Sequence, residues 1–191
     1  MSACRLWSRR LWILACALGV ALGIAACGQT SQPPSALNDG VYVDAGPITY
    51  QLQVSRELNP YATEDRQYLA GLPTGTTGLS PTELWYGVFL WAKNQSSQAH
   101  PTSDNFVIVD SSGGLYYPLR LDSSVNSYAW TRQVLAPAAI EPAPGTTASD
   151  GATQGGLLLF KLPTSVYANR PLTLRIYPQG GGKAGEISLD L

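Results

Sequence analysis

The sequence ELWYGVFLWAK, Glu83 to Lys93, decides the fold class because it is apolar at both of its alternating sets of positions. A half-exposed strand alternates apolar and polar residues, whereas a strand covered on both faces is apolar throughout. The stretch is long enough for a helix, but its aromatic and β-branched content favours a central strand. Trp85 and Trp91 are six positions apart and share a face of such a strand, so we expect both in the sandwich core.

Shorter strand patterns lie on both sides of this stretch. The sequence ITYQLQV, residues 48–54, alternates strictly and predicts a half-buried strand. FVIVD (106–110) and LYYPL (115–119) flank the turn sequence SSGG and predict a hairpin, with Pro118 at an edge or a strand end. Further strands are predicted at residues 41–43, 157–163, 172–177 and 186–191.

Two long segments interrupt the strand pattern. Residues 56–72 predict a short helix or an irregular excursion, and residues 122–156 form the longest irregular part. About seven to eight short strands without alternating amphipathic helices predict an all-β fold, an antiparallel immunoglobulin-like β-sandwich. The Cys…Trp…Cys pattern of antibody domains is absent, so "immunoglobulin-like" describes the architecture alone.

The N-terminus has the pattern of an export signal. Arg5, Arg9 and Arg10 precede the uncharged run LWILACALGVALGIAA, residues 11–26. This run is shorter than the roughly 17 residues at the lower limit for a membrane-spanning helix. A removable signal peptide is therefore favoured over a permanent span. The sequence SRRLWI leaves open whether the general secretory or the twin-arginine route exports the chain.

The end of the apolar run, IAACG at residues 24–28, resembles the lipobox of bacterial lipoproteins. The resemblance implies transfer of a diacylglyceryl group to Cys27 and cleavage between Ala26 and Cys27. Two or more acyl chains give stable membrane anchoring. An ordinary secretory signal with an accidental cysteine is the alternative.

This resemblance predicts a three-part organisation and a place in the cell. We expect a signal peptide at residues 1–26, a lipidated flexible tether at 27–40, and the sandwich domain at 41–191. The domain would then be held at the extracytoplasmic face of the cell membrane by its lipid.

Composition excludes several classes of protein. The other two cysteines, Cys4 and Cys16, lie in the predicted signal peptide, so the mature domain holds no disulfide and depends on its core. After Cys27 the chain has nine basic and thirteen acidic residues, a net charge of 9 − 13 = −4. No basic cluster is present, and we expect no nucleic-acid partner.

The residues that usually carry catalysis are scarce. His100 is the only histidine, and no Gly-x-Ser-x-Gly elbow accompanies it. The usual zinc and copper ligand sets are missing, and Asp104, Asp110 and Asp122 do not have EF-hand spacing for calcium. Two carboxylates assembled in space remain a weak hydrolase possibility. We expect no enzyme activity, no metal and no cofactor.

Four aromatic residues near loops or edges are the candidate interaction residues: Trp130, Tyr128, Tyr116 and Tyr117. A platform of such side chains could bind a sugar or a partner protein. The favoured hypothesis is a lipid-anchored, non-catalytic domain that uses its long loops to bind an envelope partner protein. The alternative is an envelope lipoprotein that binds a small molecule or glycan through exposed aromatics.

The order of motifs is similar to that of a broad group of immunoglobulin-like bacterial lipoproteins of unknown function. The similarity is carried by VFLWAKNQSS (88–97), FVIVDSSGGLYYPL (106–119), GGLLLFKLP (155–163) and EISLDL (186–191). It covers roughly residues 40–191 and implies a β-sandwich. The group supplies no catalytic residues.

Overall fold

The fold is given by a computed structural model, which describes residues 35–36 and 42–189. The predicted signal peptide, the cleavage site at Ala26 and Cys27, and most of the predicted tether lie outside the described residues. No helix in the described part of the chain is long and apolar enough to cross a membrane.

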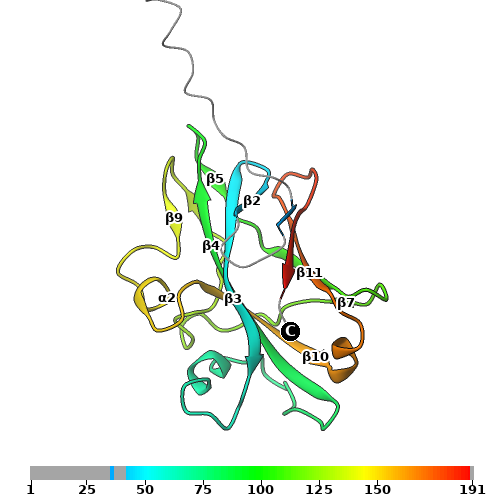
Figure 1. The fold of residues 1–191 in the computed structure, drawn as a ribbon. Helices are drawn as coiled ribbons and strands as arrows, with labels where there is room; N and C mark the ends of the chain where they lie inside the picture. The colour runs from blue at the N-terminus through cyan, green and yellow to red at the C-terminus, as the bar shows by residue number, and fades with distance from the viewer. Residues whose placement is uncertain (1–34, 37–41, 190–191) are drawn as a thin grey trace, which may run out of the picture. The chain divides into compact units, whose positions relative to one another are not determined.

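Two sheets form the frame of the domain (Figure 1). The first sheet has the strand order β1 (Ser35–Ala36), β12 (Gly185–Leu189), β11 (Leu172–Tyr177), β6 (Asn105–Val109) and β7 (Leu115–Tyr116). The second has the order β10 (Gly156–Pro163), β4 (Glu83–Asn94), β3 (Ile48–Leu58) and β2 (Tyr42–Ala45), and β9 (Ile140–Glu141) also pairs with β4. β5 (His100–Pro101) and β8 (Val134–Leu135) pair with each other.

The predicted all-β, antiparallel sandwich is confirmed. Seven described strands have four or more residues, namely β2, β3, β4, β6, β10, β11 and β12. Their pairings are antiparallel. β1 pairs in parallel with β12, so two residues of the segment predicted as a tether add to the first sheet. The helical elements are single turns: η1 (Arg66–Leu69), α2 (Thr147–Asp150) and η2 (Thr164–Tyr167).

The inner core lies between the two sheets. Its β4 side chains are every second residue, Leu84, Tyr86, Val88, Leu90 and Ala92, and all are buried. From the opposite sheet, β11 and β12 contribute their own alternate residues to the same cluster. The alternation predicted for the last strand is confirmed for Ile187 and Leu189, which are buried here.

A second cluster, the outer cluster, covers the opposite face of β4 and β10. Trp85 and Phe89 of β4 and Leu157 and Leu159 of β10 pack there, and the remaining buried members are Leu58, Tyr68, Tyr128 and Ala148. β4 is therefore covered on both faces, as its sequence predicts. Trp85 is buried in this outer cluster and not between the sheets, and Trp91 is only half-buried and belongs to neither cluster.

The two irregular segments form the cover of the outer cluster and are tied to each other. The rings of Tyr68 and Tyr128 meet edge to face at 4.9 Å. The buried amide of Asn126 donates to the carbonyl oxygens of Tyr68 and Ala70, at 3.1 and 3.0 Å. Asn126 thereby satisfies backbone groups that no sheet partner reaches.

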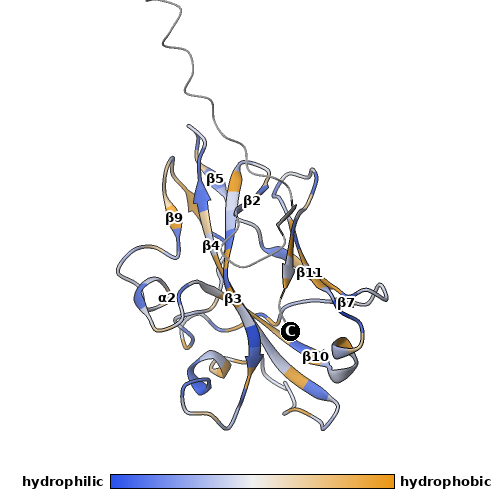
Figure 2. Ribbon diagram, in the orientation of Figure 1, coloured by the Kyte–Doolittle hydropathy of each residue, from blue (hydrophilic) through white to orange (hydrophobic). Residues whose placement is uncertain are grey.

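An ion pair anchors the first irregular segment to β3. Arg56 donates to both carboxylate oxygens of the buried Asp65, and the backbone N–H of Asn59 donates to the same carboxylate. The guanidinium of Arg56 holds the pKa of Asp65 below its usual value. The C-terminal end of β3, which carries Arg56, is correspondingly hydrophilic (Figure 2).

Candidate functional site: a cleft beside Trp130

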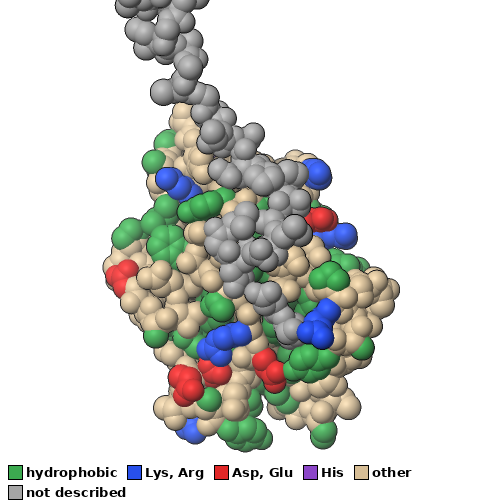
Figure 3. Space-filling view, in the orientation of Figure 1, with side chains coloured by type: hydrophobic (Ala, Val, Ile, Leu, Met, Phe, Trp, Pro, Cys, Tyr) green, Lys and Arg blue, Asp and Glu red, His purple; other side chains and the backbone are tan. Residues whose placement is uncertain are grey.

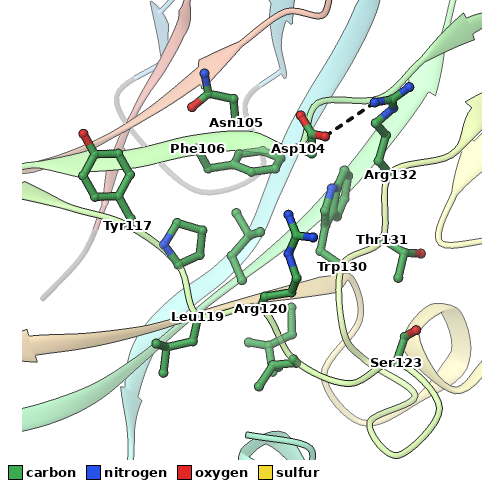
Figure 4. A pocket seen from close by; sticks show the side chains of 14 residues that line it. Asp104, Asn105, Phe106, Tyr117, Leu119, Arg120, Ser123, Trp130, Thr131 and Arg132 are labelled. Atoms are coloured by element: carbon green, nitrogen blue, oxygen red, sulfur yellow. Dashed lines mark ion pairs between the residues drawn. The ribbon is translucent and has the colours of Figure 1, made fainter. Parts of the chain in front are cut away.

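A cleft of about 460 Å³ opens at the side of the sandwich, next to the edge strand β10. Its walls come from residues 104–106, 117–121, 130–132 and 157–158, with Ser123 at the rim (Figure 4). The volume is in the range of about 300–1,000 Å³ that is typical of small-molecule sites. The walls combine aromatic, aliphatic, amide, hydroxyl and charged side chains.

The segments that form the cleft are held in place by backbone bonds to β10. The N–H of Leu119 donates to the carbonyl of Leu159 at 2.7 Å, and the N–H of Trp130 donates to the carbonyl of Leu157 at 3.0 Å. These bonds use backbone groups at the free edge of β10, which would otherwise need water. The cleft is thus mounted on a strand of the frame, although its walls are loops.

Trp130 is fixed from several sides. Its indole N–H donates to the carbonyl oxygen of Ser103 at 2.9 Å. Its ring packs against Phe106 edge to face at 5.6 Å and against Tyr50 at 6.2 Å. Gly156 lies so close that a Cβ there would stand 2.7 Å from Trp130 Cε3, so any larger residue would displace the ring. The half-buried Trp130 is therefore a pre-organised wall of the cleft.

Ser103, which positions Trp130, is itself held by the inner core. Its N–H donates to the hydroxyl of the buried Tyr50 at 2.7 Å, and its hydroxyl donates to the carbonyl of Tyr177 at 2.6 Å. Burial raises the pKa of Tyr50, so this hydroxyl stays neutral and accepts the bond. The wall of the cleft is connected through Ser103 to both β3 and β11.

Three charged side chains line the cleft, and two of them face each other. Asp104 and Arg132 form an ion pair with Nη1 and Oδ2 3.6 Å apart (Figure 4). Asp104 also accepts a hydrogen bond from the side-chain amide of Gln179. Arg120 extends into the cleft beside Trp130 and has no ion pair or hydrogen bond with the described residues (Figure 4). The charges of the cleft sum to +1.

The structure brings together two of the four predicted aromatic residues. Trp130 and Tyr117 line the same cleft, and Tyr117 is 63% exposed. Tyr128 is only 4% exposed, because it packs into the outer cluster against Tyr68. Tyr116 is half-buried and faces Asp110. The four residues do not form one continuous platform.

Tyr116 is part of the hairpin turn that the sequence predicts. Asp110 accepts hydrogen bonds from Ser112, from the N–H of Gly114 and from the hydroxyl of Tyr116. These bonds, the side-chain hydrogen bond of Ser112 first, hold the pKa of Asp110 far below its usual value. Asp110 is therefore the structural centre of the turn, and it orients the chain that leads into Tyr117.

A smaller hollow of about 210 Å³ shares Ser123, Trp130 and Thr131 with the cleft and is lined in part by Glu141. Glu141 is 4% exposed, and its Oε2 has no hydrogen-bond partner among the described residues. Burial raises the pKa of Glu141 to about 7, an effect that a hydrogen bond with Thr102 opposes. Glu141 thus changes its charge close to neutral pH.

Sequence reasoning did not single out Arg120, Arg132 or Glu141. Arg120 directly follows the predicted hairpin and belongs to no binding or catalytic motif, and Arg132 meets Asp104 only because two distant segments fold together. In the sequence, Asp104, Asp110 and Asp122 could supply oxygen ligands to calcium, although they do not have EF-hand spacing. Here each has a different local role: Asp104 pairs with Arg132, Asp110 organises its turn, and Asp122 accepts from Ser124. His100 is half-buried in β5.

Comparison with known proteins supports the fold alone. No protein-family model and no curated protein matches the chain. The crystal structure of the YjhA protein of Bacillus subtilis is similar, with a TM-score of 0.54 and 11% identity over 81% of this chain and 100% of that one. An uncharacterised β-sandwich protein of Clostridium difficile has a TM-score of 0.43 and 10% identity over 85% and 99% of the two chains. A conserved hypothetical protein of Bacillus anthracis has a TM-score of 0.42 and 8% identity over 79% and 93%.

Proposed function

We propose that this protein is a lipid-anchored, extracytoplasmic binding domain without catalytic function, and that the cleft beside Trp130 takes a small molecule or glycan. The observation that carries the proposal is the cleft itself, in which a fixed indole, the exposed ring of Tyr117 and several polar side chains converge. Ligand sites typically combine apolar walls with a few polar groups that fix orientation. The only carboxylate among the cleft residues, Asp104, is engaged by Arg132 and Gln179, which suits recognition better than proton transfer.

The binding site is tested with the full chain in a thermal-shift screen of glycans and small molecules. A ligand at 100 times its dissociation constant adds about 2.7 kcal/mol to the free energy of unfolding. Tyr117→Ala should weaken the response several-fold, because it removes an exposed wall of the cleft. Tyr61→Ala is the matched control, since Tyr61 is 86% exposed and lies outside the cleft. Equal responses of the two variants would show that the ligand binds outside the cleft.

The lipid anchor is a separate part of the proposal and rests on residues 24–28. Mass spectrometry of the protein isolated from its native membrane should find Cys27 as the first residue, with its thiol and amine carrying lipid. Cys27→Ser should release the domain from the membrane fraction. A native protein that retains residues 1–26, or that carries an unmodified Cys27, would contradict the anchor without affecting the cleft.

A partner protein of the envelope is the second candidate for the ligand. Exposed apolar side chains outside the cleft favour it, since Val134 of β8 is 68% exposed and Val125 is 62% exposed. On the face seen in Figure 3, acidic and basic side chains are interspersed and not gathered by sign, so a charged partner surface is not favoured there. If a partner protein binds here, cross-linking in membranes should give a specific product with the wild type. That product should be lost in Val134→Lys and kept in Tyr61→Ala.

A further inference from the structure

Arg120 is the charged side chain of the cleft that has no ion pair with the described residues. The other cation, Arg132, is held by Asp104, and Asp104 is held in addition by Gln179. Arg120 has no such partner among the described residues, and its side chain extends into the cleft beside Trp130 (Figure 4). A guanidinium in this position presents up to five N–H donors to whatever occupies the cleft.

The position of Arg120 is fixed by its neighbours. Leu119, directly before it, is bonded to the backbone of β10, and the partly buried side chains of Leu119 and Leu121 pack on the outer cluster. Arg120 therefore points away from the cluster on a segment that is secured at both adjacent residues. Because the segment on both sides of Arg120 is already ordered, only the exposed side chain of Arg120 has to be ordered when a ligand binds.

The surroundings of Arg120 combine apolar walls with access from solvent. Trp130, Phe106 and Leu158 line the same cleft, and Arg120 itself is exposed, so an anion that enters the cleft can reach its guanidinium. The predicted mature chain has a net charge of −4, so the long-range field of the protein does not attract anions. Selection of an anion would have to come from the cleft itself, through Arg120.

From these contacts we propose that the cleft selects an acidic saccharide, whose carboxylate binds Arg120 and whose ring lies against Trp130. This inference rests on the proposed function and names the class of ligand for the same site. A carboxylate can accept two parallel hydrogen bonds from one guanidinium. The apolar face of a sugar ring fits the aromatic wall, and its hydroxyls fit the amide of Asn105 and the hydroxyl of Thr131, which also line the cleft.

Digalacturonate and its uncharged dimethyl ester test the inference, because they differ only in the charges of the two carboxylates and in two methyl groups. Isothermal titration calorimetry with the full chain should give about tenfold tighter binding of the acid than of the ester, the difference expected when one charge-assisted contact is lost. Arg120→Gln should remove this preference and leave binding of the ester unchanged. Raising the salt concentration should weaken binding of the acid alone.

Arg66→Gln is the matched control for Arg120→Gln. It changes the net charge of the protein by the same amount, and Arg66 is an exposed residue of η1 that lies outside the cleft. The acid must lose affinity on Arg120→Gln and keep it on Arg66→Gln. An equal loss in both variants would indicate a general charge effect and would overturn the inference.

The remaining outcomes separate the inference from the proposed function. Equal binding of acid and ester, with both weakened by Tyr117→Ala, would overturn selection by charge and leave the cleft as the binding site. Binding of neither compound would also overturn the acidic-saccharide inference, and the thermal-shift screen would then decide on the cleft. If an aromatic carboxylic acid such as benzoate binds more tightly than digalacturonate, the acidic-saccharide inference is overturned. The cleft would then select carboxylates of another class.

Discussion

The two faces of β4 are packed by different kinds of structure. The inner face meets the opposite sheet, and both sides of that contact are alternate residues of regular strands. The outer face meets η1, α2 and the loops around residues 119–128, which have almost no regular structure. The same strand is therefore half of a sandwich core on one side and the base of a loop assembly on the other.

This difference assigns different tasks to the two clusters. The inner core closes the sandwich, because it connects the strands of both sheets. The outer cluster holds the long loops in place and, through Leu119 and Leu121, the segment that carries Arg120. Loops that carry binding residues need such a support, since they lack the ladder of hydrogen bonds that fixes a strand. The cleft lies where these two packing regions meet.

Phe160→Ala should give the largest loss of stability, because Phe160 is fully buried in the inner core. Replacing a buried phenylalanine by alanine costs about 4 kcal/mol, since rigid strands on both sides cannot close the cavity. Urea unfolding followed by circular dichroism measures the change. A loss below about 1 kcal/mol would mean that the inner core can rearrange and does not determine the fold.

Phe89→Ala is the matched change in the outer cluster, because Phe89 is also fully buried and its ring meets Tyr68 at 5.0 Å. We expect a loss of about 3 kcal/mol, less than for Phe160, because loops can move inward and fill part of the cavity. Relative to the wild type, the variant should also show a larger increase in amide-proton exchange in residues 59–82 than in β11. Equal losses and uniform exchange would show that the two clusters act as one core.

The inner core could be predicted from the sequence, and the outer cluster could not. Strand alternation placed Ile187 and Leu189 on the inner face, and the apolar run at residues 83–93 indicated cover on both faces of β4. The sequence did not indicate what covers the outer face. Tyr128 and Trp130 are two residues apart, yet one is buried in the outer cluster and the other lines the cleft. Their directions depend on contacts with β10, far away in the chain.

The candidate site was predictable only in its aromatic residues, for a related reason. Trp130 and Tyr117 are conspicuous in any sequence because of their size and their position in loops. Asp104 and Arg132 are 28 residues apart and are joined by no periodic pattern, so their pairing follows from the fold alone. Nothing in the sequence marks Arg120 as a binding residue, since an arginine in a loop is usually a solvated residue.

The buried carboxyl of Glu141 gives an effect on stability that depends on pH. Its pKa is raised to about 7 by burial, so the native state keeps a proton that the unfolded chain releases between about pH 4.3 and 7. Stability should therefore fall as the pH rises through this window and level off above it. The glutamine of Glu141→Gln cannot ionise, so the variant should match the wild type at pH 4 and be about 3 kcal/mol more stable than it at pH 8.

Urea unfolding at pH 4 and pH 8 makes this test, with Glu64→Gln as the control because Glu64 is exposed. In the control, the free energy of unfolding should differ between pH 4 and pH 8 by the same amount as in the wild type. A Glu141→Gln variant that is less stable than the wild type at pH 8 would show that the ionised carboxylate has a favourable partner in the folded protein. The hollow beside Trp130 would then hold a charge that is compensated within the folded protein, as the carboxylate of Asp65 is by Arg56.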